Sequence, residues 1–115
     1  MTTIYHNPRC SKSRETLALL QQQGINPEIE LYLEVPPTAS ALEKIMTQLD
    51  CKITDAIRFK EDLAEQLNLK PDDKRSVREW CELLAAHPVL IERPIVIHNH
   101  KARIGRPPDK VLEIL

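Results

Sequence analysis

The sequence predicts an α/β domain built on a mixed four-stranded sheet, with a helical insertion between a β-α-β half and a β-hairpin half. A short apolar strand leads directly into an amphipathic helix near the N-terminus. The middle of the chain carries two helical stripes, and strand-like segments then precede a last helix. With 115 residues and no repeat or linker, residues 1–115 are expected to form a single domain.

The first half of the sheet is predicted from two short strands separated by a helix. Residues 2–6 form the first strand and residues 11–22 the helix, with Gly24 as its C-terminal stop. Residues 28–33 alternate between apolar and other side chains, which predicts a second strand. The apolar side chains expected on one face of this strand are those of Ile29, Leu31 and Leu33.

The middle of the chain is predicted to be helical. Ser40 and Glu43 fit a capping box, and apolar residues then recur with helical spacing over residues 42–49. Residues 54–69 form a less regular, mostly helical stretch. The same apolar spacing returns over residues 77–84, which predicts a second strong helix.

The second half of the sheet is predicted as a hairpin followed by a helix. Residues 89–91 and 94–97 are strand-like, residues 98–100 suit a turn, and residues 102–104 are a possible return strand. A last helix is expected to begin at Pro107-Pro108. Its predicted buried side consists of Val111, Leu112 and Leu115.

This order of elements is that of the thioredoxin-like fold with helices inserted in its middle. In that plan the loop after the first strand carries a reactive cysteine at a helix N-terminus, and a proline before the third strand lies against it. Cys10 and Pro94 are the candidates for these two residues. The fold resemblance implies a cis Arg93-Pro94 peptide bond.

Composition excludes several classes of protein. The charged fraction of 29%, the mean hydropathy of −0.36 and the lack of a long apolar run argue against a membrane protein. The first residues lack the features of a signal peptide, so a cytoplasmic location is expected. Three cysteines without a CxxC or Cys/His pattern argue against a disulfide framework and a zinc site, and no bound metal or cofactor is expected. The few aromatic residues and the balanced charge disfavour nucleic-acid binding.

Charge is unevenly distributed along a chain whose net charge is −1. Residues 1–25 carry three basic side chains against one acidic, and residues 93–115 carry five against two, so the middle is acidic. If the fold brings the two ends together, they form a basic region that attracts anions. The alternative is ordinary solvated surface.

Cys10 is the most informative residue of the chain. A cysteine at the first turn of a helix meets free backbone N–H groups and the positive end of the helix dipole, both of which favour the thiolate. Arg9, Lys12 and Arg14 add positive charge nearby. His6 is either a neighbour that lowers the pKa of the thiol or a residue that only ends the strand.

The run His6-Asn7-Pro8-x-Cys10-x-x-Ser13-Arg14 resembles the start of the glutaredoxin-coupled arsenate reductases. Three further segments follow the same family in the same order, at residues 31–37, 87–96 and 106–115. The resemblance implies reduction of arsenate to arsenite through a cysteine–arsenate adduct on Cys10, with arsenate or a similar oxyanion as the bound ligand. It also implies glutathione as co-substrate and glutaredoxin as the partner that resolves the mixed disulfide.

The resemblance further assigns a substrate site to Arg58, Arg93 and Arg106. Arsenate is a tetrahedral oxyanion, and planar guanidinium groups bind such oxygens in pairs while remaining charged. A thiolate that approaches this anion is repelled unless cations offset the charge. The residues expected to support the site are His6, Ser13 and Pro94.

Two other functions remain open. One is a thiol oxidoreductase or deglutathionylating enzyme of the same fold, whose pocket binds a peptide or a glutathione carboxylate. The other is a non-catalytic adaptor similar to the Spx-type regulators that bind RNA polymerase. Those regulators typically carry a CxxC switch, whereas Ser13 stands at the second position of this motif and implies resolution by an external thiol. Cys51 and Cys81 are expected to be packing residues.

Overall fold

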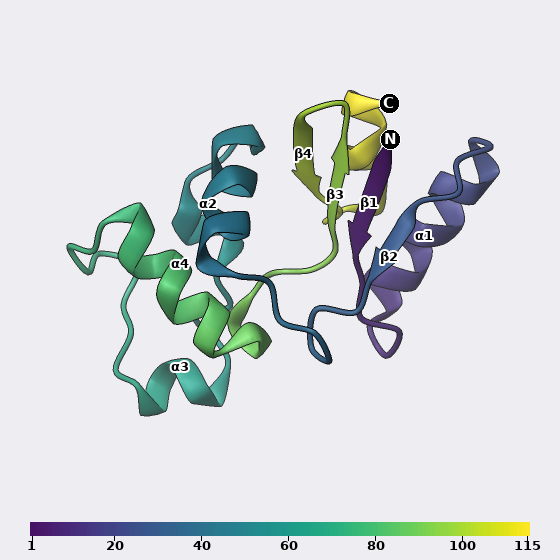
Figure 1. The fold of residues 1–115 in the computed structure, drawn as a ribbon. Coiled ribbons are helices and arrows are strands. Elements are labelled where there is room, and N and C mark those ends of the chain that lie inside the picture. The colour runs from purple at the N-terminus through teal and green to yellow at the C-terminus, as the bar shows by residue number, and fades with distance from the viewer.

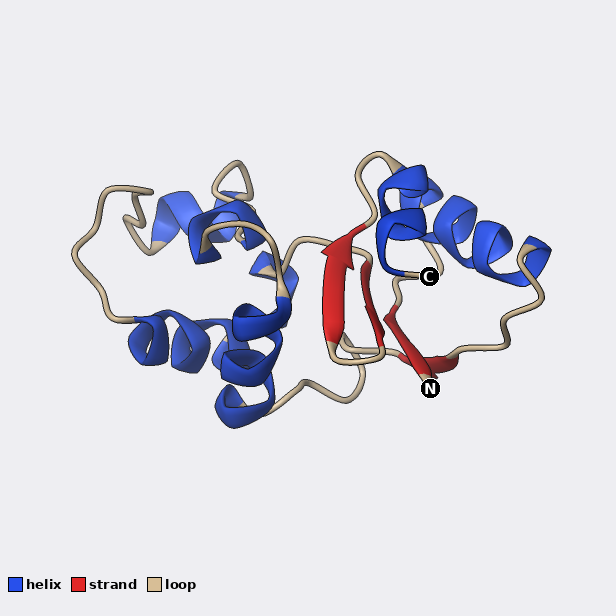
Figure 2. Cartoon of the chain, turned by 90° about the horizontal axis from the view of Figure 1, so that it is seen from above, coloured by secondary structure: helices blue, strands red, loops and turns tan.

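A computed structural model describes residues 1–115 and contains one four-stranded sheet with helices on both faces (Figures 1 and 2). The strands are β1 (Thr2–Tyr5), β2 (Glu28–Glu30), β3 (Ile95–His98) and β4 (Lys101–Ile104). Their order is β2-β1-β3-β4, in which only β1 and β2 are parallel. A two-residue turn of Asn99 and His100, both with positive φ, joins β3 to β4. The predicted thioredoxin-like sheet is therefore confirmed.

One face of the sheet is covered by α1 (Ser11–Gln22) and by the C-terminal 3-10 helix η3 (Pro108–Ile114). In Figure 2 these two helices lie together on one side of the strands. The expectation that Leu112 and Leu115 are buried is wrong, because they are 41% and 39% exposed. Side chains three residues apart share a face in a 3-10 helix, so Val111 and Ile114 are buried instead. The core on this face consists of Ile4, Leu20, Val96, Val111 and Ile114.

The other face is covered by the predicted helical insertion. It contains two longer helices, α2 (Ala39–Gln48) and α4 (Val77–Ala86), which contact one another. The shorter elements are η1 (Ile53–Ala56) and α3 (Asp62–Gln66). Figure 1 shows α2, α3 and α4 grouped on the side of the sheet opposite α1. The larger of the two buried clusters lies here, with Trp80 as its largest side chain.

The predicted cap of α2 is wrong. Thr38 is the N-cap, and its Oγ1 accepts a hydrogen bond from the N–H of Ala41 at 3.1 Å, so Ser40 lies inside the first turn. Both residue types can cap a helix, but Ser40 Oγ accepts a hydrogen bond from Arg78 Nη1 of α4 at 3.4 Å instead. Glu43, the other half of the predicted capping box, instead accepts a hydrogen bond from Arg78 of α4 at 2.8 Å.

The second strand is shorter than predicted. After Glu30 the chain turns, because the N–H groups of Glu34 and Val35 both donate to the carbonyl of Leu31 at 2.9 Å. Alternation along the sequence predicts which side of the sheet each side chain points to only while the strand continues, and the turn after Glu30 ends that pattern. Tyr32 is therefore only 2% exposed, whereas Leu33 is exposed. Ile29 lies within β2, before the turn and at the edge of the sheet, and it is exposed as well.

Residues 88–90 form the 3-10 helix η2 (Pro88–Leu90) where residues 89–91 were expected to be a strand. The N–H of Leu90 donates to the carbonyl of His87 at 3.0 Å, and Pro88 fixes the first φ of this turn. Only Ile91 pairs in a β-bridge, with Ile57. None of the helices has both the length and the apolar character needed to span a membrane.

Candidate active site

Cys10 is the N-cap of α1, in the loop that follows β1. The backbone of this loop is fixed by two local hydrogen bonds. The N–H of Cys10 donates to the carbonyl of Asn7, and the N–H of Arg9 donates to Asn7 Oδ1, both at 3.0 Å. The thiol is only partly buried, so it can be reached from outside. The loop thus places a thiol in front of the free N–H groups of the first helical turn.

The pKa of the Cys10 thiol lies below its ordinary value. Partial burial raises this pKa, but the backbone N–H groups of Ser13 and Lys12 and the guanidinium groups of Arg93 and Arg106 together outweigh it. Arg106 Nη1 lies 4.0 Å from Cys10 Sγ. The helix N-terminus and two cations therefore stabilise the thiolate, and both cations, Arg93 and Arg106, come from the C-terminal part of the chain.

His6 and Ser13 fix the loop from its buried side through hydrogen bonds. His6 Nδ1 lies 2.6 Å from Ser13 Oγ, and this oxygen also accepts a hydrogen bond from the N–H of Asn7 at 3.0 Å. Both side chains are buried. Burial first, and the charge of Arg14 second, lower the pKa of His6, so the imidazole is neutral near pH 7. His6 therefore contributes a hydrogen bond to the loop rather than a positive charge.

Pro94 lies buried beside the start of β3, and its peptide bond with Arg93 is cis, as the fold resemblance implied. The Arg106-Pro107 bond is also cis, which was not predicted. Gly105 N–H donates to the carbonyl of Pro94 at 2.9 Å. A Cβ on Gly105 would lie 2.6 Å from Thr16 Oγ1 and 2.9 Å from Pro94 Cγ. Only glycine therefore lets the end of β4 approach α1 closely enough to bring Arg106 to the thiol.

A short backbone pairing brings the helical insertion to the sheet. The N–H of Arg58 donates to the carbonyl of Leu90, and the N–H of Glu92 donates to the carbonyl of Ala56, both at 2.8 Å. These bonds flank the bridge described above between the segments around residues 57 and 91. The pairing sets Arg58 opposite Leu90 and brings it to the same pocket as Arg93, although 35 positions separate the two arginines in the sequence.

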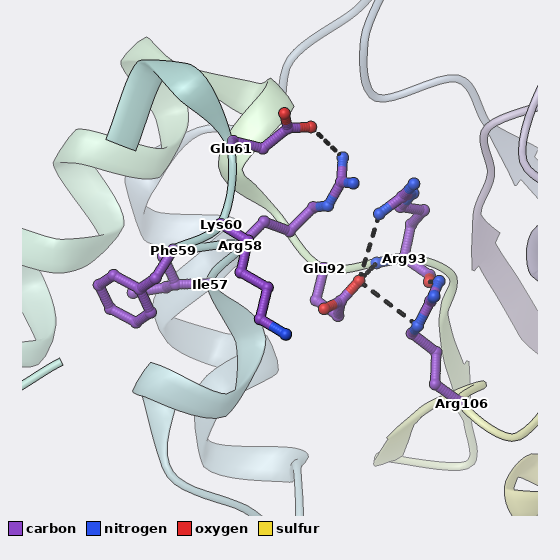
Figure 3. Close-up of a pocket in the computed structure, with 8 residues that line it drawn as sticks. All are labelled: Ile57, Arg58, Phe59, Lys60, Glu61, Glu92, Arg93 and Arg106. Carbon is purple, nitrogen blue, oxygen red and sulfur yellow. Dashed lines mark hydrogen bonds and ion pairs between the residues drawn. The ribbon is translucent and has the colours of Figure 1, made fainter. Parts of the chain in front are cut away.

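The three arginines assigned by the family resemblance line one open pocket of about 460 Å³ (Figure 3). Figure 3 shows the guanidinium group of Arg93 between those of Arg58 and Arg106. Arg93 Nε is buried without a hydrogen-bond partner in the protein. Arg106 Nη1 donates to the carbonyl of Arg93 at 3.2 Å. The full lining is Ile57, Arg58, Phe59, Lys60, Glu61, Glu92, Arg93 and Arg106.

Sequence reasoning missed two carboxylates in this pocket. Glu61 Oε1 lies 2.5 Å from Arg58 Nη1, and Glu92 Oε1 lies 3.4 Å from Arg93 Nη1 and 3.7 Å from Arg106 Nε. Their sequence signal is weak, since each is only an acidic residue one or three positions from an arginine. The carboxylates of Glu61 and Glu92 therefore partly neutralise the positive charge of the three arginines in this pocket.

Tyr32 is a third residue that sequence reasoning missed, because alternation predicts a strand over residues 28–33. Burial, the largest influence, raises its pKa to about 12, and the charges that act on it include those of Arg93, Arg58, Cys10 and Glu92. The phenol therefore stays protonated at neutral pH. It lies within the electrostatic reach of both the thiol and the arginines.

Known proteins are similar in sequence to almost the whole of this chain. The sequence model of the ArsC family matches residues 5–114. The chain belongs to the ArsC family. It is 50% identical over 113 residues to the arsenate reductase of Haemophilus influenzae, covering 97% of each chain. It is equally similar to the uncharacterised protein YfgD of Escherichia coli K12, covering 97% of this chain and 94% of that protein.

The fold is shared with solved members of the family. An arsenate reductase from Vibrio cholerae superposes with a TM-score of 0.93 at 50% identity, covering 99% of this chain and 97% of that one. The family resemblance recognised in the sequence is thus confirmed, together with its thioredoxin-like fold.

Proposed function

We propose that this ArsC-family protein reduces arsenate to arsenite, with Cys10 as the nucleophile. The observation that carries the proposal is the position of Arg106. Its guanidinium lies 4.0 Å from the Cys10 thiol and also lines the pocket that contains Arg58 and Arg93. Cys10 does not itself line this pocket, but Arg106 places a thiol with a lowered pKa beside a group of arginines that suits a tetrahedral oxyanion. The names of the close relatives support arsenate as this anion.

Binding is assigned to Arg93 and Arg106, with Arg58 completing the site. Arg93 is the most buried of the three at 14% side-chain exposure, and its Nε is a donor without a partner in the protein. A buried donor of this kind gains most from an anionic acceptor, because leaving it unpaired is costly. Arg58 reaches the pocket from the helical insertion and is steadied by Glu61.

The first chemical step joins sulfur to arsenic. The Cys10 thiolate attacks the arsenic of the bound arsenate, the S–As bond forms, and one arsenate oxygen takes up protons and leaves as water. Repulsion between the thiolate and the anionic arsenate opposes this step. The arginines lower that barrier because they offset the charge of the anion while the thiolate approaches. Arsenic remains pentavalent in the adduct.

The second step transfers the electrons. The thiolate of glutathione attacks Cys10 Sγ, the S–As electron pair moves to arsenic, and trivalent arsenite leaves. Cys10 is then joined to glutathione in a mixed disulfide, which glutaredoxin reduces with the transfer of two electrons. An external thiol is required because Ser13, in the first turn of α1, stands where a resolving cysteine of a CxxC pair would be, and it is hydrogen-bonded to His6.

The other cysteines are poor candidates for that role. Cys81 is fully buried in α4, and burial raises its pKa to about 11. Cys51 is half-buried, and burial together with the charges of Asp55 and Asp50 raises its pKa as well. Both thiols therefore stay protonated at neutral pH, and protonated thiols are weak nucleophiles.

The test is the production of arsenite by the purified protein with arsenate, glutathione and glutaredoxin. We expect turnover by the wild type and by Cys51→Ser, and none by Cys10→Ser. A wild type that forms no arsenite would refute the proposal. If it instead reduces glutathionylated peptides without arsenate, the deglutathionylating function takes its place.

A further inference from the structure

Glu92 is a carboxylate inside the anion site rather than at its edge. Its Oε1 lies 3.3 Å from the backbone N–H of Arg93, 3.4 Å from Arg93 Nη1 and 3.7 Å from Arg106 Nε. Figure 3 shows its carboxylate joined by dashed lines to both arginines. The side chain is 22% exposed and lines the same pocket. Any anion held by Arg93 and Arg106 therefore comes into contact with Glu92.

A carboxylate at this position is costly for a site that binds anions. It repels the ligand, and it already occupies donors of two of the three arginines. A carboxylate can also accept hydrogen bonds but cannot donate one. The only favourable contact that it can make with an oxyanion is therefore with an O–H group on that anion.

We propose that Glu92 is a specificity-determining residue that selects tetrahedral oxyanions that carry a proton. Arsenate and phosphate keep at least one O–H group at neutral pH, and this group donates to Glu92 Oε1. Sulfate and selenate carry no proton, so they face the carboxylate with lone pairs only. This inference rests on the proposed oxyanion site, and it narrows the substrate class of that site.

Charge alone predicts the opposite preference. At pH 7 sulfate is a full dianion, whereas phosphate is partly a monoanion, so arginines without Glu92 would hold sulfate at least as well. A preference for phosphate over sulfate therefore reports the hydrogen bond to the carboxylate. Selenate tests whether the size of the anion explains the preference instead. It is close to arsenate in size but carries no proton, so weak binding of selenate would reflect the missing proton.

Glu61 offers a matched control. It lines the same pocket and pairs with an arginine, but its ion-pair partner is Arg58 alone, whereas Glu92 contacts both Arg93 and Arg106. Neutralising Glu61 removes one negative charge from the pocket without removing the acceptor at Arg93 and Arg106. The Glu61→Gln substitution should therefore strengthen the binding of phosphate, sulfate and selenate to a similar degree.

The experiment measures how anions protect Cys10 from alkylation. Wild type, Glu92→Gln and Glu61→Gln are titrated with phosphate, sulfate and selenate at pH 7 and constant ionic strength. The rate of Cys10 modification by iodoacetamide is followed by mass spectrometry of its peptide. We expect the wild type to bind phosphate at least about tenfold more tightly than sulfate or selenate, as the loss of a hydrogen bond to a charged group implies. In Glu92→Gln the preference should fall below about threefold, mainly through tighter binding of sulfate, while Glu61→Gln should retain it.

The outcomes separate this inference from the function on which it rests. A wild type that binds sulfate or selenate as tightly as phosphate, or a Glu92→Gln protein that retains the tenfold preference, overturns the role of Glu92. The wild-type comparison decides alone if Glu92→Gln does not fold. If no anion protects Cys10 at all, the oxyanion site itself is refuted, and the proposed function fails with it.

Discussion

Replacing Gly105 by alanine should damage the protein through a steric conflict at the centre of the site. The new Cβ would lie 2.6 Å from Thr16 Oγ1 and 2.9 Å from Pro94 Cγ. Neither neighbour can yield easily, because both are buried and Thr16 Oγ1 donates to the Lys12 carbonyl at 2.8 Å. Overpacking of this kind costs about 1–3 kcal/mol, and we expect the upper half of that range.

The conflict also has an electrostatic consequence. The end of β4 must move away from α1, and Arg106, the next residue, moves with it. Since Arg106 stabilises the thiolate from 4.0 Å, the pKa of the Cys10 thiol should rise toward its ordinary value. Urea unfolding measures the first effect, and ultraviolet absorbance of the thiolate against pH measures the second.

Gly24 provides the control for this experiment. Its φ of +76° makes alanine unfavourable by about 1 kcal/mol, but a Cβ at this position would meet nothing within 4 Å, and the residue lies at the far end of α1. Gly24→Ala should therefore lower the free energy of unfolding without changing the pKa of Cys10. The reasoning is refuted if Gly105→Ala costs less than about 0.5 kcal/mol, the range of ordinary surface substitutions, or leaves the Cys10 titration unchanged.

Three further predictions concern the thiol and its loop. Arg106→Gln should raise the pKa of Cys10 and slow its alkylation at pH 7, and an unchanged rate would contradict the assigned contact. Because the folded-state pKa of Cys10 is lowered, folding gains stability above the unfolded-state pKa and loses it as the pH falls through the folded-state pKa. Urea unfolding should show this gain with rising pH in the wild type but not in Cys10→Ser. Ser13→Ala removes the acceptor of the Asn7 N–H and the partner of His6, and it should cost about 1–3 kcal/mol in the same assay. A cost near zero would show that water replaces the hydroxyl.

Local patterns in the sequence predicted the order of the elements well, because strands and helices leave short-range signals. Cys10 could be placed at a helix N-terminus from its neighbours alone. The errors arose where two local interpretations compete. Leu112 and Leu115 fit a helix of 3.6 residues per turn, whereas the chain adopts the 3-10 form, and the strand expected over residues 28–33 ends at a turn.

The site could be predicted less completely, because it is assembled by contacts between distant segments. No local pattern shows that Arg58 faces Arg93, and only the family resemblance placed them together. The structure supplies the cause in the backbone pairing of Ile57 with Ile91. Glu92 was missed for a related reason: its importance depends on Arg106, which lies on the far side of the β-hairpin.

Arg106 links the three parts of the site. In the free protein its Nη1 lies near the Cys10 thiolate and its Nε near Glu92, so one guanidinium balances two negative groups. Under the proposed function, a bound oxyanion would use donors of the same guanidinium. Arg106 would then offset the negative charge of the anion and of the sulfur together as the two approach one another. The same side chain therefore lowers the pKa of the thiol in the free protein and, in the proposed reaction, would hold the anion beside it, so the loss of Arg106 should impair thiol activation and anion binding together.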